Sequence, residues 1–398
     1  MSVPAPSPVP PGRAALLLFL LWLAGNSLRI TILAVPPIVA MVRDDFALNA
    51  TEVALLSSIP PALFAIAALL GSLLVAKLGL FRALLGGLVL TAVGSGLRGA
   101  SPTFAALCVT TVAMSAGVAM LQPIMPAIVR AWVPQRIALG TALYTNGLLV
   151  GEVFPTLLTL PLVLPWLGGG WRDSLVFWSV PVALIAVAVA ALAPRGPAVR
   201  SAATGQPQKW LPDWHQGLVW RLGALFCCIN ALYFSANAFL PIYLAHHGRH
   251  DLIGAALAAL NFGQLPASFL LLAWGGRVQR KAWPYVAVGL GSLVALGGLV
   301  FAVGAMTAWW AGLLGFCVAG GLILALMLPP SLCKPEDVAR TAAGTFTLSY
   351  GGGVGIALAG GAAWDLTGIP AMAFLPLAVC AVGLVLATAV MKARGELV

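Results

Sequence analysis

The sequence predicts an all-α membrane protein with twelve transmembrane helices, and three observations support this class. Of the 398 residues, 61% are hydrophobic and only 8% are charged, whereas a soluble domain has roughly 25% charged residues. Twelve segments are long and apolar enough to cross a bilayer, which takes about 20 residues each. The Lys and Arg residues gather at segment ends and in short loops. Lipid is therefore the expected solvent for most of the chain.

The predicted spans follow one another through short connections. They cover residues 14–42, 52–76, 80–99, 103–130, 136–164, 174–194, 217–245, 252–274, 284–304, 307–333, 338–363 and 369–392. Many contain internal Gly or Pro, which bundled membrane helices tolerate. The first apolar run is too long for the core of a signal peptide, so we expect it to be retained as a spanning helix.

The distribution of positive charge predicts how the chain is oriented. With both termini in the cytoplasm, sixteen of the 21 Lys and Arg residues lie at cytoplasmic ends or loops. Four lie on the outer side, at Arg43, Arg98, Arg172 and Arg249. An excess of Lys and Arg is typical of cytoplasmic loops. We expect a multi-pass protein of the bacterial inner membrane with both termini cytoplasmic, and no nucleic-acid partner, because no basic patch interleaved with aromatic residues is present.

One long loop divides the chain into two halves of six helices each. Its Gly, Pro and Ser content is typical of a flexible linker. The expected units are a tail at 1–13, a six-helix bundle at 14–194, a linker at 195–216, a second bundle at 217–392 and a tail at 393–398. Similar turns, Gly170-Trp171-Arg172-Asp173 and Asp365-Leu366-Thr367-Gly368, precede the sixth and twelfth helices. Such a repeat places a substrate site between the halves, near the membrane midplane.

Two ionisable residues are predicted deep in the membrane, Arg29 in the first span and Glu152 in the fifth. A charge at the centre of a spanning helix costs roughly 2.5–3.5 kcal/mol, so each needs a partner or a wet cavity. The planar guanidinium of Arg29 suits capture of a carboxylate-like anion. Trp22 and Asn26 share its helix face at spacings of seven and three residues. The alternative is a purely structural pair of Arg29 with Glu152.

Glu152 has three possible roles. It can be a counter-ion that releases Arg29 when substrate arrives, a proton carrier, or a structural partner only. Other polar side chains in the spans, such as Gln122 and Tyr233, must also find partners in an apolar medium. Such side chains more often form hydrogen bonds between helices than bind a substrate.

Several motifs resemble the cyanate permease and 2-nitroimidazole transporter family of the major facilitator superfamily. They are Asn26-Ser27-Leu28-Arg29, Ala34-Val35-Pro36-Pro37, the stretch from Gly117 to Pro126, Gly140-Thr141-Ala142-Leu143-Tyr144-Thr145, Gly170-Trp171-Arg172 and Leu240-Pro241-Ile242-Tyr243-Leu244. The resemblance covers nearly the whole chain and implies the major facilitator fold. Two features depart from the wider superfamily. The region after the second helix, around Lys77, lacks the usual Asp, and Glu152 follows Gly151 where proton-driven drug antiporters have a Gly-Pro pair.

The resemblance also extends the predicted site. In this superfamily helices one, four, seven and ten face the central cavity, and helix eleven lies close by. The substrate-binding candidates are therefore Arg29, Asn26, Trp22, Gln122, Tyr233, Asn237 and Tyr350. Glu152 is the candidate for coupling or for a charge pair.

We expect a secondary active transporter that moves a small anion or small polar solute, cyanate-like or an organic anion, by alternating access. The alternative is a proton-coupled exporter of small heterocyclic or drug-like compounds such as nitroimidazoles. An enzyme or receptor in the membrane is less well supported, because the sequence offers no catalytic triad, Walker motif or soluble signalling domain. We expect no cofactor and no metal. The expected partners are the solute, the bilayer and, as a candidate coupling ion, the proton, and we expect a monomer.

Overall fold

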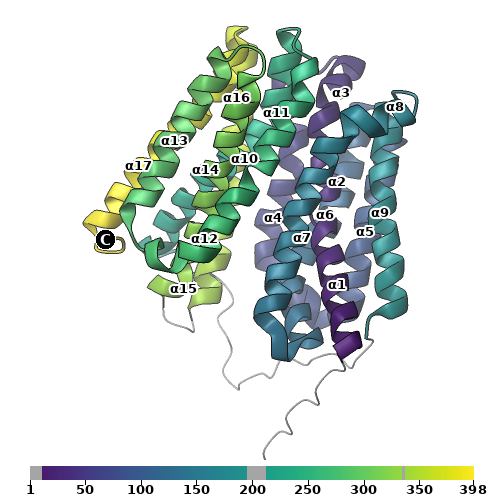
Figure 1. The fold of residues 1–398 in the computed structure, drawn as a ribbon, viewed down its shortest axis with the longest axis vertical. Helices are drawn as coiled ribbons and strands as arrows, with labels where there is room; N and C mark the ends of the chain where they lie inside the picture. The colour runs from purple at the N-terminus through teal and green to yellow at the C-terminus, as the bar shows by residue number, and fades with distance from the viewer. Residues whose placement is uncertain (1–10, 195–211, 334–336) are drawn as a thin grey trace, which may run out of the picture.

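A computed structural model describes residues 11–194, 212–333 and 337–398, and every regular element in these ranges is helical (Figure 1). The α-helices are α1 (Pro11–Ser27), α2 (Ile30–Leu33), α3 (Val39–Phe46), α4 (Ala50–Leu78), α5 (Leu80–Gly99), α6 (Phe104–Trp132), α7 (Ile137–Leu158), α8 (Leu164–Trp166), α9 (Trp171–Leu192), α10 (Gly217–His246), α11 (Asp251–Phe262), α12 (Gln264–Val278), α13 (Ala282–Phe301), α14 (Met306–Leu326), α15 (Leu328–Leu332), α16 (Val338–Thr367) and α17 (Leu375–Ala393). Short segments of other helix types are η1 (Pro36–Ile38), η2 (Pro134–Arg136), η3 (Thr159–Val163) and η4 (Pro370–Phe374). The predicted all-α class is confirmed.

Eleven helical stretches among the described residues are long and apolar enough to cross a membrane. The predicted span that falls short of this criterion is 338–363, which lies within α16. That helix has 30 residues and is long enough to cross. It contains three consecutive glycines, Gly351, Gly352 and Gly353.

The first span is not the single helix that the sequence predicts at 14–42. It is divided into α1, α2, η1 and α3, with breaks at Leu28–Arg29 and at the pair Pro36-Pro37. Proline has no backbone N–H and disfavours a helical residue before it, which accounts for the second break. The eighth predicted span, 252–274, is likewise divided into α11 and α12 at Gly263. A side chain at Gly263 would collide with the backbone, because a Cβ there would lie 2.3 Å from the carbonyl oxygen of Gly312.

The helices that precede residue 195 lie on one side of the molecule, and those that follow residue 211 lie on the other (Figure 1). This arrangement is the one that the predicted division into two bundles requires, and the boundaries of that division remain a prediction. The linker prediction, 195–216, lies mostly outside the described residues, as does most of the N-terminal tail.

The two groups of helices meet along α4 and α16. At one end of this seam, the carboxylate of Asp365 accepts hydrogen bonds from the backbone N–H groups of Ala50 (2.9 Å) and Thr51 (2.8 Å) and from the Thr51 hydroxyl (2.6 Å). Next to it, the Arg43 guanidinium lies 5.1 Å from the ring centre of Trp364. We call this end of the molecule the Asp365 end. A carboxylate at the first turn of a helix satisfies unpaired N–H groups and complements the helix dipole, so Asp365 caps α4 from the opposite group.

Helices α1 and α7 pack closely against each other. Three glycines make the approach possible. A Cβ at Gly25 would lie 2.1 Å from the carbonyl oxygen of Tyr144, one at Gly147 would lie 2.2 Å from that of Trp22, and one at Gly151 would lie 2.5 Å from that of Asn26. Small residues are a common device for bringing membrane helices together. Here they join the helix that leads to Arg29 to the helix that carries Glu152.

Candidate functional site

Arg29 lies at the break between α1 and α2. Its backbone (φ −129°, ψ −28°) leaves the helical conformation, and its N–H donates to the carbonyl of Asn26, only three residues earlier. Its own carbonyl accepts from Ile32 and Leu33 and starts α2. Only 8% of the residue is exposed. A discontinuous helix is a common way to place polar groups in the middle of a transporter.

Arg29 and Glu152 form a buried ion pair. The distance from Arg29 Nε to Glu152 Oε1 is 3.1 Å, and Glu152 is 2% exposed. The other carboxylate oxygen, Oε2, accepts a hydrogen bond of 2.8 Å from Gln264 Nε2. Because Gln264 is the first residue of α12, the carboxylate of Glu152 links the first group of helices to the second.

A chain of hydrogen bonds continues from Gln264 into the second group. Its amide lies 3.4 Å from Asn261 Oδ1, which also accepts from the hydroxyl of Tyr233 at 2.8 Å. Asn261 Nδ2 donates to Asn237 Oδ1 at 3.0 Å. All four side chains are buried, and their mutual bonds offset the cost of burying polar groups. The chain of contacts therefore runs from Arg29 through Glu152 to α10.

Gln264 and Asn261 were not among the predicted site residues. Their sequence signal was weak, because a single buried amide in a membrane helix most often bonds two helices. The structural reason for their role is the break at Gly263, which lies between them and which the sequence alone did not reveal.

Aromatic rings enclose the guanidinium of Arg29. Its Cζ lies 5.6 Å from the ring centres of both Phe64, on α4, and Phe234, on α10. Tyr350, on α16, packs edge-on against Phe64 at 5.3 Å and against Phe234 at 6.2 Å. A cation within about 6 Å of an aromatic face is attracted to it. The two rings come from opposite groups of helices, so Arg29 is held at the boundary between them.

The ion pair does not use all the donors of Arg29. Among the described residues, its Nη1 nitrogen is buried and has no hydrogen-bond partner. Nearly all buried donors in proteins are satisfied, so an exception calls for an explanation. A free N–H of an arginine in an aromatic enclosure is a suitable donor to a small anion.

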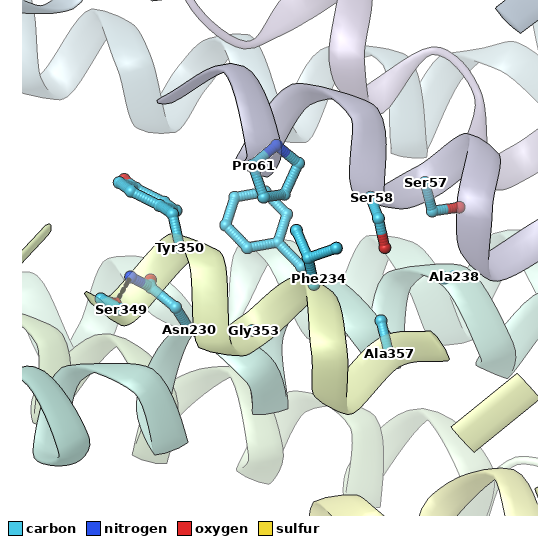
Figure 2. Close-up of a pocket in the computed structure, with 11 residues that line it drawn as sticks. Ser57, Ser58, Pro61, Asn230, Phe234, Ala238, Ser349, Tyr350, Gly353 and Ala357 are labelled. Carbon is cyan, nitrogen blue, oxygen red and sulfur yellow. Dashed lines mark hydrogen bonds between the residues drawn. The ribbon is translucent and has the colours of Figure 1, made fainter. Parts of the chain in front are cut away.

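A small cavity lies beside this enclosure, between α4, α10 and α16 (Figure 2). Figure 2 shows Pro61 and Ser58 of α4 near Phe234 and Tyr350, and Asn230, whose Nδ2 donates to the Ser349 hydroxyl at 2.6 Å. The cavity measures about 10 Å³, roughly the minimum for one water molecule. A second cavity of about 40 Å³ is also lined by Phe234, together with Tyr233 and Asn237.

The other predicted site residues have different surroundings. Trp22 Nε1 donates to Asn146 Oδ1 at 2.9 Å, and Asn26 Nδ2 donates to the carbonyl of Trp22 at 3.0 Å, so both lie at the junction of α1 with α7. They were expected on the same face as Arg29. That spacing rule holds only along a continuous helix, and the break at Leu28–Arg29 interrupts it. Gln122 is half-buried, and no described contact joins it to Arg29, although its Nε2 has no partner among the described residues.

Comparison with known proteins agrees with this architecture. Residues 17–357 match the Major Facilitator Superfamily. The chain is 26% identical to the cyanate transport protein CynX of Escherichia coli (strain K12) over 382 residues, 94% of this chain and 96% of that protein. It is 24% identical to the 2-nitroimidazole transporter of the same organism over 249 residues, 62% of each. The predicted resemblance to these transporters is confirmed.

Solved structures show the same fold at low sequence identity. The nucleoside transporter NupG superimposes with a TM-score of 0.77 at 13% identity, covering 94% of this chain and 99% of that chain. A bacterial homologue of the human lysosomal transporter Spinster, in an inward-facing and unoccupied conformation, gives a TM-score of 0.72 at 16% identity, covering 96% of both chains. The predicted major facilitator fold is therefore confirmed.

Proposed function

The chain belongs to the Major Facilitator Superfamily and is a transporter, and from this premise we propose that it is a secondary active carrier that moves a small anion or small polar solute by binding it at Arg29. The observation that carries the proposal is the free Nη1 donor of Arg29, buried among aromatic rings from both groups of helices. One of its relatives is named for transport of cyanate, a small monoanion. A cyanate-like or organic anion fits a site of this size and charge.

We infer that the anion exchanges with Glu152 for contact with Arg29. The carboxylate now lies 3.1 Å from the guanidinium and holds a second hydrogen bond from Gln264. When an anion takes the place of the carboxylate at Arg29, Gln264 still solvates Glu152. Glu152 is then a counter-ion, and a proton carrier if it takes up a proton in the same step. The driving force is the proton gradient or exchange with another solute.

The place of these contacts supports the proposed alternating access. Arg29 touches Phe64 on one group of helices and Phe234 on the other. Glu152 and Gln264 form a second bridge. A solute that changes either bridge changes the relative stability of the two orientations of the groups, which is the requirement for coupling binding to rocking.

A second candidate solute is a small planar heterocycle that is moved outward with protons. Three aromatic side chains, Phe64, Phe234 and Tyr350, meet at Arg29. A nitro-substituted ring could stack on them while its oxygens accept from the guanidinium. The relationship to a 2-nitroimidazole transporter supports this candidate.

A binding screen tests the proposal and separates the two candidates. Purified protein is heated with small monoanions, or with planar nitro-heterocycles, and the unfolding temperature is recorded. A ligand at one hundred times its Kd raises the free energy of unfolding by about 2.7 kcal/mol. The matched control is Arg13→Leu, which removes an exposed arginine. A shift that persists unchanged in Arg29→Leu plus Glu152→Leu would contradict binding at Arg29.

We propose an inner-membrane location with both termini in the cytoplasm. The positive charge of the predicted cytoplasmic loops supports this orientation. In this orientation the Asp365 end faces the outside.

A further inference from the structure

Arg98 occupies a position that its sequence context does not suggest. The charge pattern groups it with the arginines of the outer boundary. The structure instead buries it completely, at 0% exposure, in the last turn of α5. It is one of the largest fully buried side chains among the described residues.

The contacts of Arg98 leave its charge without an acidic partner. Its Nη2 donates to the carbonyl of Thr31 at 2.7 Å and to the Ser95 hydroxyl at 3.0 Å. In the described part of the chain, Nε and Nη1 are buried and have no hydrogen-bond partner, and no ion pair includes this residue. A buried cation that is neither paired nor fully hydrogen-bonded is among the costliest arrangements in a protein.

A structural role explains only part of this geometry. The break in the first span leaves the carbonyl of Thr31 outside the regular ladder, since the N–H of Val35 bonds to Ile32. Arg98 Nη2 satisfies that carbonyl. A neutral amide could do the same, so the bond does not account for a full charge or for the two free nitrogens.

Arg98 lines the second cavity, which measures about 40 Å³. At about 10–15 Å³ per water-sized group, this space holds roughly three such groups. Its lining includes polar side chains of Ser57, Thr111, Tyr233 and Asn237, and it contains no Asp or Glu. The Tyr233 and Thr111 hydroxyls already donate to Asn261 and Leu107, so the main donors that the cavity offers are the two free nitrogens of Arg98, with room for about three water-sized groups.

The cavity is also placed along the expected route of a solute. Its wall includes Leu33 and Pro36, which follow Arg29 along the first span towards α3 and the Asp365 end. It shares Phe234 with the aromatic enclosure of Arg29. It shares Tyr233 and Asn237 with the polar chain that ends at Glu152. An ion in this cavity would lie between the Arg29 site and the Asp365 end, where Asp365 bonds to the start of α4.

We propose that Arg98 and this cavity form a second subsite for a small monoanion of about three non-hydrogen atoms, through which the solute passes between Arg29 and the Asp365 end. The proposal rests on the proposed function in that the same kind of anion is taken to occupy both sites. The two arginines then act in series, and each accepts the anion as it leaves the other.

Thiocyanate is a suitable probe, because it is a stable linear monoanion of three atoms. Equilibrium dialysis with the labelled ion counts ions bound per protein, and the infrared stretch of its nitrile distinguishes a buried ion from one in water. The proteins are the wild type, Arg98→Met, Ala238→Leu and the double variant Arg29→Leu plus Glu152→Leu. Ala238 lines both this cavity and the smaller one beside the enclosure of Arg29, so leucine fills them while Arg98 and Arg29 are both kept.

We expect two buried thiocyanate ions in the wild type and one in each of the three variants. Wild-type binding of two ions that neither Arg98→Met nor Ala238→Leu reduces would overturn the subsite. So would a single wild-type ion that only the double variant loses, and so would no buried ion at all. If Arg98→Met does not yield folded protein, the result with Ala238→Leu decides.

The same experiment gives a different result if the proposed function is wrong and Arg29 binds no anion. One wild-type ion that persists in the Arg29→Leu plus Glu152→Leu protein and disappears in Arg98→Met supports the subsite. It also argues against an anion site at Arg29.

Discussion

Gln264 donates a 2.8 Å hydrogen bond to the carboxylate of Glu152, and this contact joins the ion pair of one group of helices to the amide cluster of the other. Its position at the first residue of α12, directly after the break at Gly263, aims an amide at the boundary between the groups. Glu152 therefore has two partners that belong to different groups of helices. The predictions that follow concern what happens when these partners are removed singly or together.

Two substitutions of Arg29 should distinguish the contribution of its charge from that of its planar shape. Arg29→Lys keeps the charge but loses the planar fork and the flat contacts with Phe64 and Phe234. We expect it to impair transport markedly, and Arg29→Ala to abolish solute binding while the protein still inserts in the membrane. Uptake into proteoliposomes and binding in detergent measure the two effects. Unchanged solute affinity in folded Arg29→Ala would rule out the Arg29 site.

The ion pair predicts that the effects of the two single substitutions on the free energy of unfolding do not add. Leaving one buried charge alone costs about 3–5 kcal/mol, whereas removing both members of a pair is often nearly neutral. Arg29→Leu plus Glu152→Leu should therefore be more stable than Arg29→Leu, though inactive. The interaction free energy between Arg29 and Glu152 is obtained from thermal unfolding of four proteins: the wild type, the two single variants and the double variant. If the effects of the single changes add, the residues do not interact.

Glu152→Gln distinguishes a proton carrier from a counter-ion. A carrier cannot work without an ionisable group, so the variant should lose uptake driven by a pH gradient and keep exchange of solute for solute. A counter-ion alone should show altered solute affinity and a retained response to the gradient. Both assays are run on the same proteoliposomes, with Asp173→Asn, an exposed carboxylate on α9, as the control.

Gln264→Leu tests the bridge between the groups of helices. It removes the amide and leaves Glu152 Oε2 without its bond, which should cost about 1–3 kcal/mol of stability. Transport should slow because binding at Arg29 is no longer linked to α12. The control is Gln135→Leu, an exposed amide in a loop. A variant with normal stability and normal uptake would show that the bridge has no part in transport.

Asp365 should control which end of the carrier is open. Its carboxylate accepts three hydrogen bonds from the start of α4, and Asp365→Ala removes them all. Spin labels at the exposed positions Asp44 and Ile369 report the distance across this end. We expect the longer distance to gain population, by about tenfold for each 1.4 kcal/mol lost. An unchanged distance distribution would mean that the cap does not hold this end closed.

The predicted orientation can be tested with fusions. A reporter that is active only after export should be inactive when fused at Gly205 and active when fused at His247. Export of the reporter fused at Gly205 would reverse the topology.

The sequence predicted the fold well because composition, span length and charge bias are properties of whole segments. It also singled out Arg29 and Glu152, since an ionisable group in an apolar span stands out against its neighbours. It did not predict the helix breaks at Leu28–Arg29 and Gly263, which depend on tertiary packing. The break at Gly263 in turn explains why Gln264 and Asn261 join the site, whereas Trp22 and Asn26 form their hydrogen bonds at the junction of α1 with α7.

Two further features could not be predicted from sequence patterns. Phe64 and Phe234 are ordinary residues for apolar helices, and only their meeting at Arg29 distinguishes them. Arg98 lies one residue from the end of its helix, where arginine usually reaches solvent or lipid headgroups. It lines a cavity together with side chains of α2, α4, α6 and α10, which come together only in the folded chain.

The glycine contacts between α1 and α7 have an electrical consequence. Because Gly25, Gly147 and Gly151 keep these two helices in backbone contact, we expect Arg29 and Glu152 to move together in the proposed alternating-access cycle. In that cycle the empty Arg29–Glu152 pair crosses with no net charge. A site loaded with a monoanion crosses with one negative charge, unless Glu152 has taken up a proton. The membrane voltage, worth about 2.3 kcal/mol per charge for each 100 mV, therefore acts on the loaded carrier and leaves the empty one free to return.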